Sequence, residues 1–197
     1  MPDRPPLIVL LAGCNGAGKS TAAPVLLQGP LAVSEFVNAD VIARGLSAFH
    51  PERAAIHAGR IMLDRLHELA AHRDSFAFES TLASRTFAPW IAQLCVTGYE
   101  FALLYLWLPS PEHAIARVAE RVRLGGHHVP EETVRRRYSG GLRNFFELYQ
   151  PMATMWRFYE NSQPSDPRLI AAGCGRIEKT IADQGVWNDV QRIAAHK

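Results

Sequence analysis

The sequence is poor in the features of secreted and membrane proteins. It has only three cysteines, Cys14, Cys95 and Cys174, which form no C-x-x-C pair, and their odd number argues against a disulfide framework. Its apolar runs are short, and residues 7–12 are too few to cross a bilayer. We therefore expect a cytoplasmic protein with no membrane partner.

The chain also has no large excess of positive or negative charge. The formal net charge is +2, with 48% hydrophobic and 20% charged residues, as in an ordinary soluble globular protein. Residues 117–143 nevertheless hold seven arginines against three glutamates. Such a segment is typical of a solvated basic helix face or of a lid that closes over phosphate. Because it lacks interleaved aromatic residues, we expect no nucleic-acid partner.

The most informative segment that is present is Gly13-Cys-Asn-Gly-Ala-Gly-Lys19-Ser20, which matches G-x-x-x-x-G-K-[ST] at every constrained position. Residues 7–12 before it are typical of a buried parallel strand, and residues 21–27 after it can form a helix. Glycines let backbone N–H groups approach phosphate oxygens. Lys19 would then reach the outer phosphates, and the Ser20 hydroxyl would ligate Mg²⁺. The residues predicted to bind the nucleotide are Gly13, Asn15, Gly16, Ala17, Gly18, Lys19, Ser20 and Thr21.

Apolar runs alternate with helical patterns along the rest of the chain, which is the signature of βαβ units. The pattern predicts an α/β fold of the P-loop NTPase type: a three-layer sandwich with a mostly parallel sheet, helices on both faces and a helical lid. We expect one domain over residues 1–197. Further strands are expected at residues 35–38, 75–79, 101–107 and 168–172, an aromatic segment that packs onto the body at 142–159, and a closing helix at 177–195.

The lid segment is expected at about residues 123–143. Gly125-Gly126-His127-His128-Val-Pro130 is the kind of flexible break that hinges a lid. Ser139-Gly140-Gly141 is interpreted as a second hinge.

Three classes of phosphate-loop protein can be tested against the remaining sequence. A GTPase needs Asn-Lys-x-Asp and Asp-x-x-Gly motifs, and neither occurs. An ABC-type ATPase would have a strand ending in Asp-Glu after its Ser-Gly-Gly signature, whereas here the following strand candidate ends without a carboxylate. The third class, small-molecule kinases, needs a base for the acceptor hydroxyl, a second carboxylate and mobile arginines over the transferring phosphoryl group.

All three requirements of a kinase can be met. Asp40 is expected to end the second strand, at the sheet edge where ligands of open α/β folds bind, and it is the candidate base. Glu79 is expected to end the third strand at the same edge, and the candidate substrate-binding residues are Glu79, Thr81 and Arg85. The candidate arginines are Arg121, which with Asp40 and Lys19 completes the predicted catalytic set, and the lid residues Arg136 and Arg137.

The segments Asn38-Ala-Asp40, Phe78-Glu-Ser-Thr81 and Leu108-Pro-Ser-Pro-Glu112, in this order after the phosphate loop, resemble the zeta-toxin-like kinases, small bacterial phosphate-loop proteins. The resemblance covers residues 7–159. It implies that Asp40 accepts the proton of the acceptor hydroxyl, that Glu79 helps to hold the substrate, and that Arg121 steadies the transferring phosphate. It also implies ATP and Mg²⁺ as cofactors, UDP-N-acetylglucosamine as the acceptor and an antitoxin protein as a partner. A further lid arginine of the toxins has no direct match, because His127-His128 occupies that stretch, so Arg136 or Arg137 would replace it.

The sequence thus predicts a phosphotransferase that moves the ATP γ-phosphoryl group to an alcohol group of a small molecule. The alternative from another class is a nucleotide-gated switch or plain ATPase that acts on a partner protein. Asp40 discriminates between them, because only a kinase requires a base for a hydroxyl acceptor.

Overall fold

The structure, a computed structural model, describes residues 4–28, 31, 33–126, 128–163 and 167–195. Seven strands of the described chain form one sheet in the order β2-β3-β1-β4-β5-β6-β7. The first five in this order are parallel, and β6 and β7 are added antiparallel at one side. The strands are β1 (Leu7–Ala12), β2 (Glu35–Val37), β3 (Phe76–Ser80), β4 (Glu100–Trp107), β5 (Met155–Glu160), β6 (Arg168–Cys174) and β7 (Ile177–Ile181).

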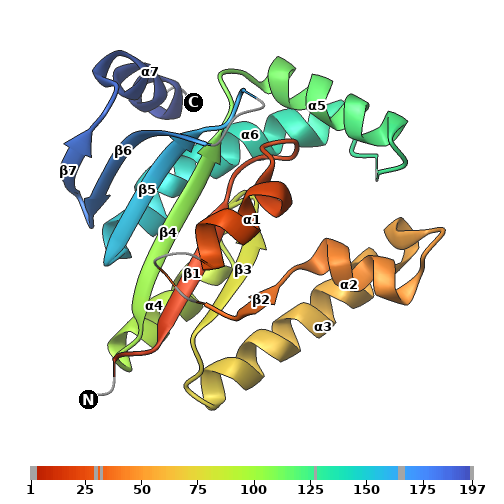
Figure 1. Ribbon diagram of the computed structural model, residues 1–197, viewed down its shortest axis with the longest axis horizontal. Helices are drawn as coiled ribbons and strands as arrows, with labels where there is room; N and C mark the ends of the chain where they lie inside the picture. The colour runs from red at the N-terminus through yellow and green to blue at the C-terminus, as the bar shows by residue number, and fades with distance from the viewer. Residues whose placement is uncertain (1–3, 29–30, 32, 127, 164–166, 196–197) are drawn as a thin grey trace.

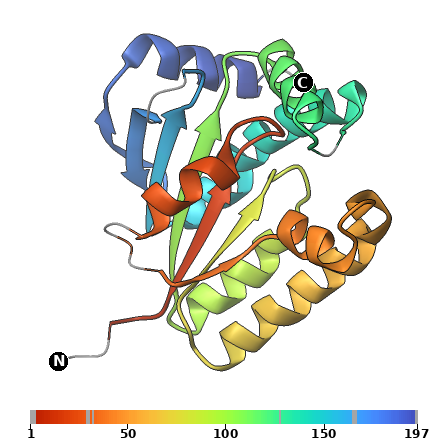
Figure 2. The ribbon, with the colours of Figure 1, turned by 45° about the vertical axis from the view of Figure 1, so that its right-hand side comes forward.

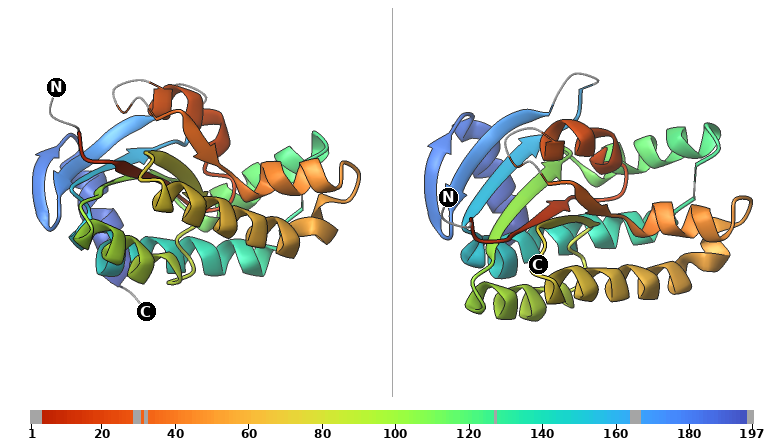
Figure 3. Two further views of the ribbon diagram at one scale, coloured as in Figure 1. Left: turned by 90° about the horizontal axis from the view of Figure 1, so that it is seen from below. Right: turned by 60° about the horizontal axis from the view of Figure 1, so that its bottom comes forward.

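Helices cover both faces of this sheet. Helix α1 lies over one face, while α3, α4 and α6 lie over the other (Figures 1 and 3). This arrangement confirms the predicted three-layer α/β sandwich. The helices are α1 (Lys19–Gln28), α2 (Ala39–Leu46), α3 (Pro51–Ala71), α4 (Phe87–Val96), α5 (Pro111–Arg123), α6 (Glu131–Asn144) and α7 (Gln184–Ala195), with a π-helical turn at Phe145–Tyr149 and a 3₁₀ turn at Gln150–Met152. Among the described residues, no helix is both long enough and apolar enough to cross a membrane.

The central strands explain why the chain folds this way. Strands β1 and β4 are apolar on both faces and almost completely buried, as strands covered by helices on both sides must be. Tyr105 of β4 stacks on Phe158 of β5 with ring centroids 5.0 Å apart. Trp187 of α7 stacks on Trp156 of β5 at 5.6 Å, which fastens α7 to the sheet.

Three expected elements differ in the structure. The aromatic segment 142–159 packs onto the body, as predicted, but its last part is β5, a parallel strand of the sheet. The expected helix over residues 177–195 is wrong in its first part, because residues 177–181 form β7 and the helix begins only at Gln184. The expected strand that ends at Asp40 is also wrong. Strand β2 ends at Val37, and the short helix α2 begins at Ala39.

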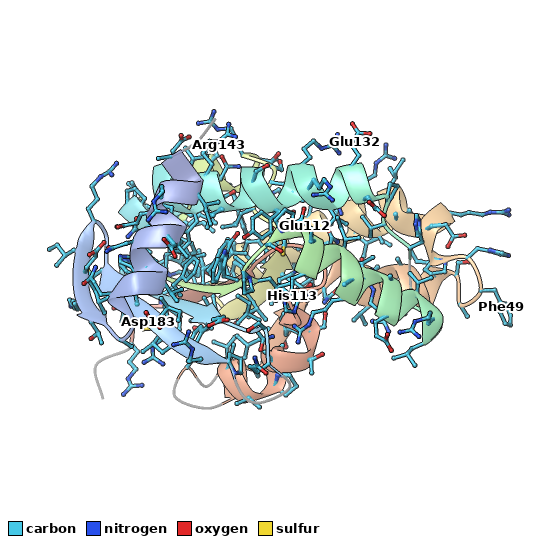
Figure 4. All side chains as sticks on the ribbon, turned by 90° about the horizontal axis from the view of Figure 1, so that it is seen from above. Phe49, Glu112, His113, Glu132, Arg143 and Asp183 are labelled. Atoms are coloured by element: carbon cyan, nitrogen blue, oxygen red, sulfur yellow. The ribbon has the colours of Figure 1, made fainter. Side chains whose placement is uncertain are left out.

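The expected hinge at Ser139-Gly140-Gly141 is wrong as well. These residues lie inside α6, an uninterrupted helix whose two ends are marked by Glu132 and Arg143 in Figure 4. A Cβ atom on Gly141 would lie 2.3 Å from the carbonyl oxygen of Thr81, so this glycine allows α6 to touch the backbone after β3. At the other expected hinge, Gly125 has φ +84° and forms part of the turn that ends α5, while His127 lies outside the described residues.

Candidate functional site

A cleft of about 680 Å³ lies at the carboxyl ends of the parallel strands. It is bordered by the segments that follow β1, β2, β3 and β5 and by helices α5 and α6. Figure 2 shows how α2 with the adjoining end of α3, and α5 with α6, project beyond this edge of the sheet. Ligands of open α/β sheets bind at this edge. Its lining contains Asn15, Gly16, Gly18, Lys19, Ser20, Thr21, Asn38, Asp40, Glu79, Ser80, Thr81, Arg117, Glu120, Arg121, Arg137, Asn161 and Gln163, among others.

The phosphate loop joins β1 to α1, as predicted. Gly13, Gly16 and Gly18 have φ values of +143°, +79° and +80°, in the region that favours glycine. The space around them is equally restrictive, since a Cβ atom on Gly13 would lie 2.3 Å from the carbonyl oxygen of Leu106. Gly13 and Ala17 shape the loop without lining the cleft, whereas the other predicted nucleotide-binding residues line it.

Lys19 is folded back over the loop that it follows. Its ammonium donates to the carbonyl oxygens of Gly13 and Cys14 at 2.9 and 3.0 Å, and the residue is only 6% exposed. It also lies 3.6 Å from the Glu79 carboxylate. The positive charge is therefore held where the outer phosphates of a bound nucleotide would lie. Burial raises the pKa of the neighbouring Cys14 thiol to about 11, so this cysteine is a neutral, loop-filling side chain.

Ser20, Asn38 and Glu79 form one hydrogen-bonded cluster beside Lys19. The Ser20 hydroxyl donates to Glu79 Oε2 at 2.9 Å, and Asn38 Nδ2 donates to the same oxygen at 2.7 Å. Glu79 therefore lies at the phosphate loop, within reach of any metal that Ser20 would bind. The sequence pattern identified Ser20 and Glu79 but did not bring them together, and it assigned nothing to Asn38.

Asp40 occupies the first turn of α2 and lines the cleft. It does not end a strand, as expected from the sequence, but it still lies at the predicted edge of the sheet. Asn38 caps the helix by accepting from the backbone N–H groups of Asp40 and Val41 at 2.8 and 3.3 Å. This leaves the Asp40 carboxylate free of the capping role that Asp often plays.

The candidate arginines separate into two groups. Arg121 and Arg137 line the cleft, and Arg137 donates to Asn15 Oδ1 of the phosphate loop at 3.2 Å. Burial lowers the pKa of the Arg137 guanidinium, as does the charge of neighbouring Arg136, while Asp40 opposes both effects. Arg136 and Arg85 are exposed and do not line the cleft.

Arg135, the first member of the same run, donates to Glu112 at the start of α5, which Figure 4 labels. This ion pair links α6 to α5.

Thr81, predicted from the sequence to bind the substrate, lines the cleft, as does Glu79.

Two further residues of the cleft were missed by the sequence analysis. Asn161, just after β5, donates through Nδ2 to the carbonyl oxygen of Ala17 in the phosphate loop at 2.7 Å. Arg117 of α5 donates to the Asn161 carbonyl oxygen at 2.6 Å. Asn161 follows a strand that the sequence did not reveal, and nothing local marks it. Arg117 could have been found, because it lies one helical turn before Arg121 on the same helix.

The described residues hold no cluster of three or more His, Cys, Asp and Glu side chains that could by itself bind a metal ion. A hydroxyl and one carboxylate are nevertheless what Mg²⁺ requires from a protein when phosphates and waters supply the other ligands. Ser20 and Glu79 provide this pair, so the residues present fit a magnesium–nucleotide complex.

Comparisons with known proteins show the family and the fold of the chain. Residues 8–139 match the family model described as an AAA domain. An uncharacterized protein of Haemophilus influenzae is 30% identical over 130 residues, which are 66% of this chain and 91% of that relative.

Among solved structures, a chain of the AvrRxo1-ORF1:AvrRxo1-ORF2 complex with sulphate ions has a TM-score of 0.71 and 16% identity, over 96% of this chain and 64% of that one. The same complex has also been solved with ATP. A chain of the PezAT chromosomal toxin–antitoxin system of Streptococcus pneumoniae has a TM-score of 0.62 and 16% identity, over 98% and 85%. A gluconokinase from Sinorhizobium meliloti has a TM-score of 0.51 and 16% identity, over 81% and 85%.

At these identities the structural likeness shows a common fold. This protein has the fold of the AvrRxo1 chain, the PezAT chain and the gluconokinase. The chain spans somewhat less than two thirds of the AvrRxo1 chain that it matches. The family match has a wider basis, since it covers the phosphate loop, the Asp40 helix, the arginines of α5 and Arg135, Arg136 and Arg137 of α6. Because that match extends over more than half of its length, the chain belongs to the AAA domain family.

Proposed function

We propose that this protein is an ATP-dependent kinase that transfers the γ-phosphoryl group to a hydroxyl group of a small acceptor. The observation that carries the proposal is that the phosphate loop and the Asp40 carboxylate line one cleft. A carboxylate at this place suits a reaction in which a hydroxyl must lose its proton. The fold shared with a gluconokinase supports the same reaction class.

In the proposed reaction the acceptor hydroxyl oxygen attacks the γ-phosphorus of ATP. The bond from that phosphorus to the β–γ bridging oxygen breaks, ADP leaves, and the hydroxyl proton passes to Asp40. Lys19 neutralises charge on the outer phosphates, and Arg121 and Arg137 stabilise the charge on the transferring group. Thr81 would border the acceptor, while Glu79, which the sequence predicted to bind the substrate, lies at the phosphate loop beside Ser20.

Mg²⁺ would be bound through Ser20, with Glu79 beside it, and would neutralise charge on the β- and γ-phosphates when present. Arg117, Asn161 and Gln163 line the same cleft, and Asn161 donates to the phosphate loop, so we propose that they border the bound ATP. Arg85, being exposed and outside the cleft, has no role in this scheme.

We further propose that residues 1–197 act as one domain in the cytoplasm, with a lid at about residues 123–143. The moving part would be the end of α5 and the segment after it. Helix α6 is held to the body along most of its length, because Val134 in its first half and Tyr138, Gly141 and Leu142 in its second half are buried.

UDP-N-acetylglucosamine is the first acceptor to test, because the Asn38-Ala-Asp40 and Phe78-Glu-Ser-Thr81 segments resemble those of zeta-toxin-like kinases. The likeness to a chain of the PezAT toxin–antitoxin system makes an antitoxin protein the partner to seek. Neither nucleic acid nor a membrane has a role in the proposal.

The test is mass spectrometry of a cell extract incubated with ATP and the protein, followed by purification of any species heavier by one phosphoryl group. Asp40→Asn should then lower transfer to that acceptor by about 10²–10⁴-fold, because the amide cannot accept a proton. ATP affinity should stay nearly unchanged. Asp64→Asn, on an exposed position of α3, is the matched control and should transfer at the parent rate.

Two results would contradict the proposal. Release of phosphate from ATP without any phosphorylated acceptor would favour the plain ATPase or switch. Equal transfer by Asp40→Asn and the parent protein would remove Asp40 as the base.

A further inference from the structure

Asn38 lies between β2 and α2 and is almost completely enclosed, at 5% exposure. Both the oxygen and the nitrogen of its side-chain amide form hydrogen bonds. Oδ1 accepts from the backbone N–H groups of Asp40 and Val41 at 2.8 and 3.3 Å. Nδ2 donates to Glu79 Oε2 at 2.7 Å and lies 3.4 Å from the Ser20 hydroxyl.

The surroundings of Asn38 determine which way its amide points. If the amide were flipped, its NH₂ group would face two N–H donors and its oxygen would face the Glu79 carboxylate. Both arrangements are repulsive, so the amide has one acceptable orientation. An aspartate would cap the helix equally well but could not donate to Glu79.

The Glu79 carboxylate is held by this contact. Within the described part of the chain, Glu79 Oε2 accepts hydrogen bonds from Asn38 and Ser20, and Lys19 approaches the other oxygen at 3.6 Å. A metal ion can bind the Ser20 oxygen through a lone pair while the hydroxyl hydrogen still donates to Glu79. Of the two donors to this oxygen, the Asn38 amide is the one that would not itself ligate the metal, so it would hold the carboxylate toward the phosphate loop whether or not the metal is bound.

The same side chain fixes the first turn of α2. The backbone N–H of Asp40 is itself one of the two groups that Asn38 caps, so the position of the candidate base is tied to the position of Glu79. We propose that Asn38 is a positioning residue that orients Glu79 toward the metal–phosphate centre and couples it to Asp40. The part concerning Asp40 rests on the proposed kinase function, whereas the part concerning Glu79 does not.

The competing explanation is that Asn38 is only a helix cap. Asn38→Ser separates the two explanations, because serine caps a helix as well as asparagine does but is too short to reach Glu79. Asn38→Ala removes both functions and serves as the reference for complete loss.

The experiment measures binding of N-methylanthraniloyl-ATP by fluorescence, first in EDTA and then across a Mg²⁺ titration. Binding in EDTA by Asn38→Ser should stay within about twofold of the parent, which also shows that the variant is folded. The Mg²⁺ concentration for half-maximal binding should rise by about tenfold in Asn38→Ser, as expected for loss of a hydrogen bond to a charged group. Asn38→Ala should show the same rise.

A parent-like Mg²⁺ requirement in Asn38→Ser would overturn the proposal and leave Asn38 as a cap. Equal loss of binding in EDTA and in Mg²⁺ would also overturn it, because Asn38 would then support the phosphate loop as a whole. These readouts need no acceptor, so they remain informative even if the kinase proposal fails.

The coupling to Asp40 is tested with the acceptor found by mass spectrometry, at saturating Mg²⁺ and ATP. Asn38→Ser should lower kcat by about tenfold with little change in the acceptor KM. In the Asp40→Asn background the same change should cost less than threefold, because the base that it positions is already absent. An additive tenfold loss in that background would contradict the coupling.

Discussion

The contact between α6 and the loop after β3 provides a sharp test of the structure. Gly140 and Gly141 are adjacent in one helix, yet their surroundings differ. A Cβ atom on Gly141 would lie 2.3 Å from the backbone oxygen of Thr81, whereas the nearest atom to a Cβ on Gly140 would be 3.9 Å away, in Ala83. Alanine substitutions at these two positions should therefore have opposite effects on stability.

The two substitutions gain the same amount from helix propensity, about 0.8–1.0 kcal/mol for replacing glycine with alanine. For Gly140→Ala nothing opposes this gain, so the variant should be up to about 1 kcal/mol more stable than the parent. For Gly141→Ala the two backbones would have to separate by about 1 Å to reach an ordinary contact, and overpacking of this kind costs about 1–3 kcal/mol or more.

The loop after β3 cannot easily yield to Gly141→Ala. Asn144 Nδ2 donates to the carbonyl oxygen of Leu82 at 2.6 Å, and the Tyr149 hydroxyl donates to that of Ser84 at 3.2 Å. The upper part of the cost is therefore expected, with a net loss of about 2 kcal/mol. Because this loop also carries Thr81 into the cleft, acceptor binding should weaken in the same variant.

Thermal unfolding followed by circular dichroism would measure both effects. For a chain of this length, 1 kcal/mol corresponds to a shift in Tm of about 2–4 °C. We expect Gly140→Ala to raise Tm by that amount and Gly141→Ala to lower it by about 4–8 °C. If the two variants had the same Tm, or if Gly141→Ala were the more stable, α6 would not pack against Thr81 as described.

Two further predictions concern the cleft itself. Lys19→Ala should abolish turnover of ATP while the protein stays folded, because the charge that faces the outer phosphates is lost; ATP turnover at the parent rate would place the nucleotide site elsewhere. Arg121→Ala should lower phosphoryl transfer by about 10³-fold at saturating ATP, whereas Arg136→Ala, at an exposed position outside the cleft, should have little effect. Similar rates for these two arginine variants would assign Arg121 a structural role only.

The parts of the fold that the sequence revealed are those with strong local patterns. Strands β1 and β4 are uninterrupted apolar runs, and α3 carries a regular stripe of buried residues, so each has a single interpretation. Strand β5 was missed because its aromatic residues fit a helix that packs on the sheet as well as a strand within it. Helix α2 has only eight residues, too few for its period to stand out.

In the site, as in the fold, features formed by adjacent residues could be predicted, whereas contacts between residues far apart in the sequence could not. The phosphate loop is contiguous in sequence, so its function could be predicted from eight residues. Asn161 contacts Ala17 across 144 positions of sequence, and Asn38 contacts Glu79 across 41. No local pattern encodes such pairs, because they arise only when the sheet brings the carboxyl ends of β1 and β5, and of β2 and β3, to the same edge.

The lid arginines are an intermediate case, because the helical period of α6 could have shown which of them reaches the cleft. The buried residues of α6 include Val134, Tyr138 and Gly141, spaced four and three apart. Arg137 comes three residues after the first of these and four before the last, so it lies on the edge of the buried face. Arg136 is two residues from both Val134 and Tyr138, which directs it away from that face. The period of the helix thus selects Arg137 as the arginine that reaches the cleft, as the contact with Asn15 bears out.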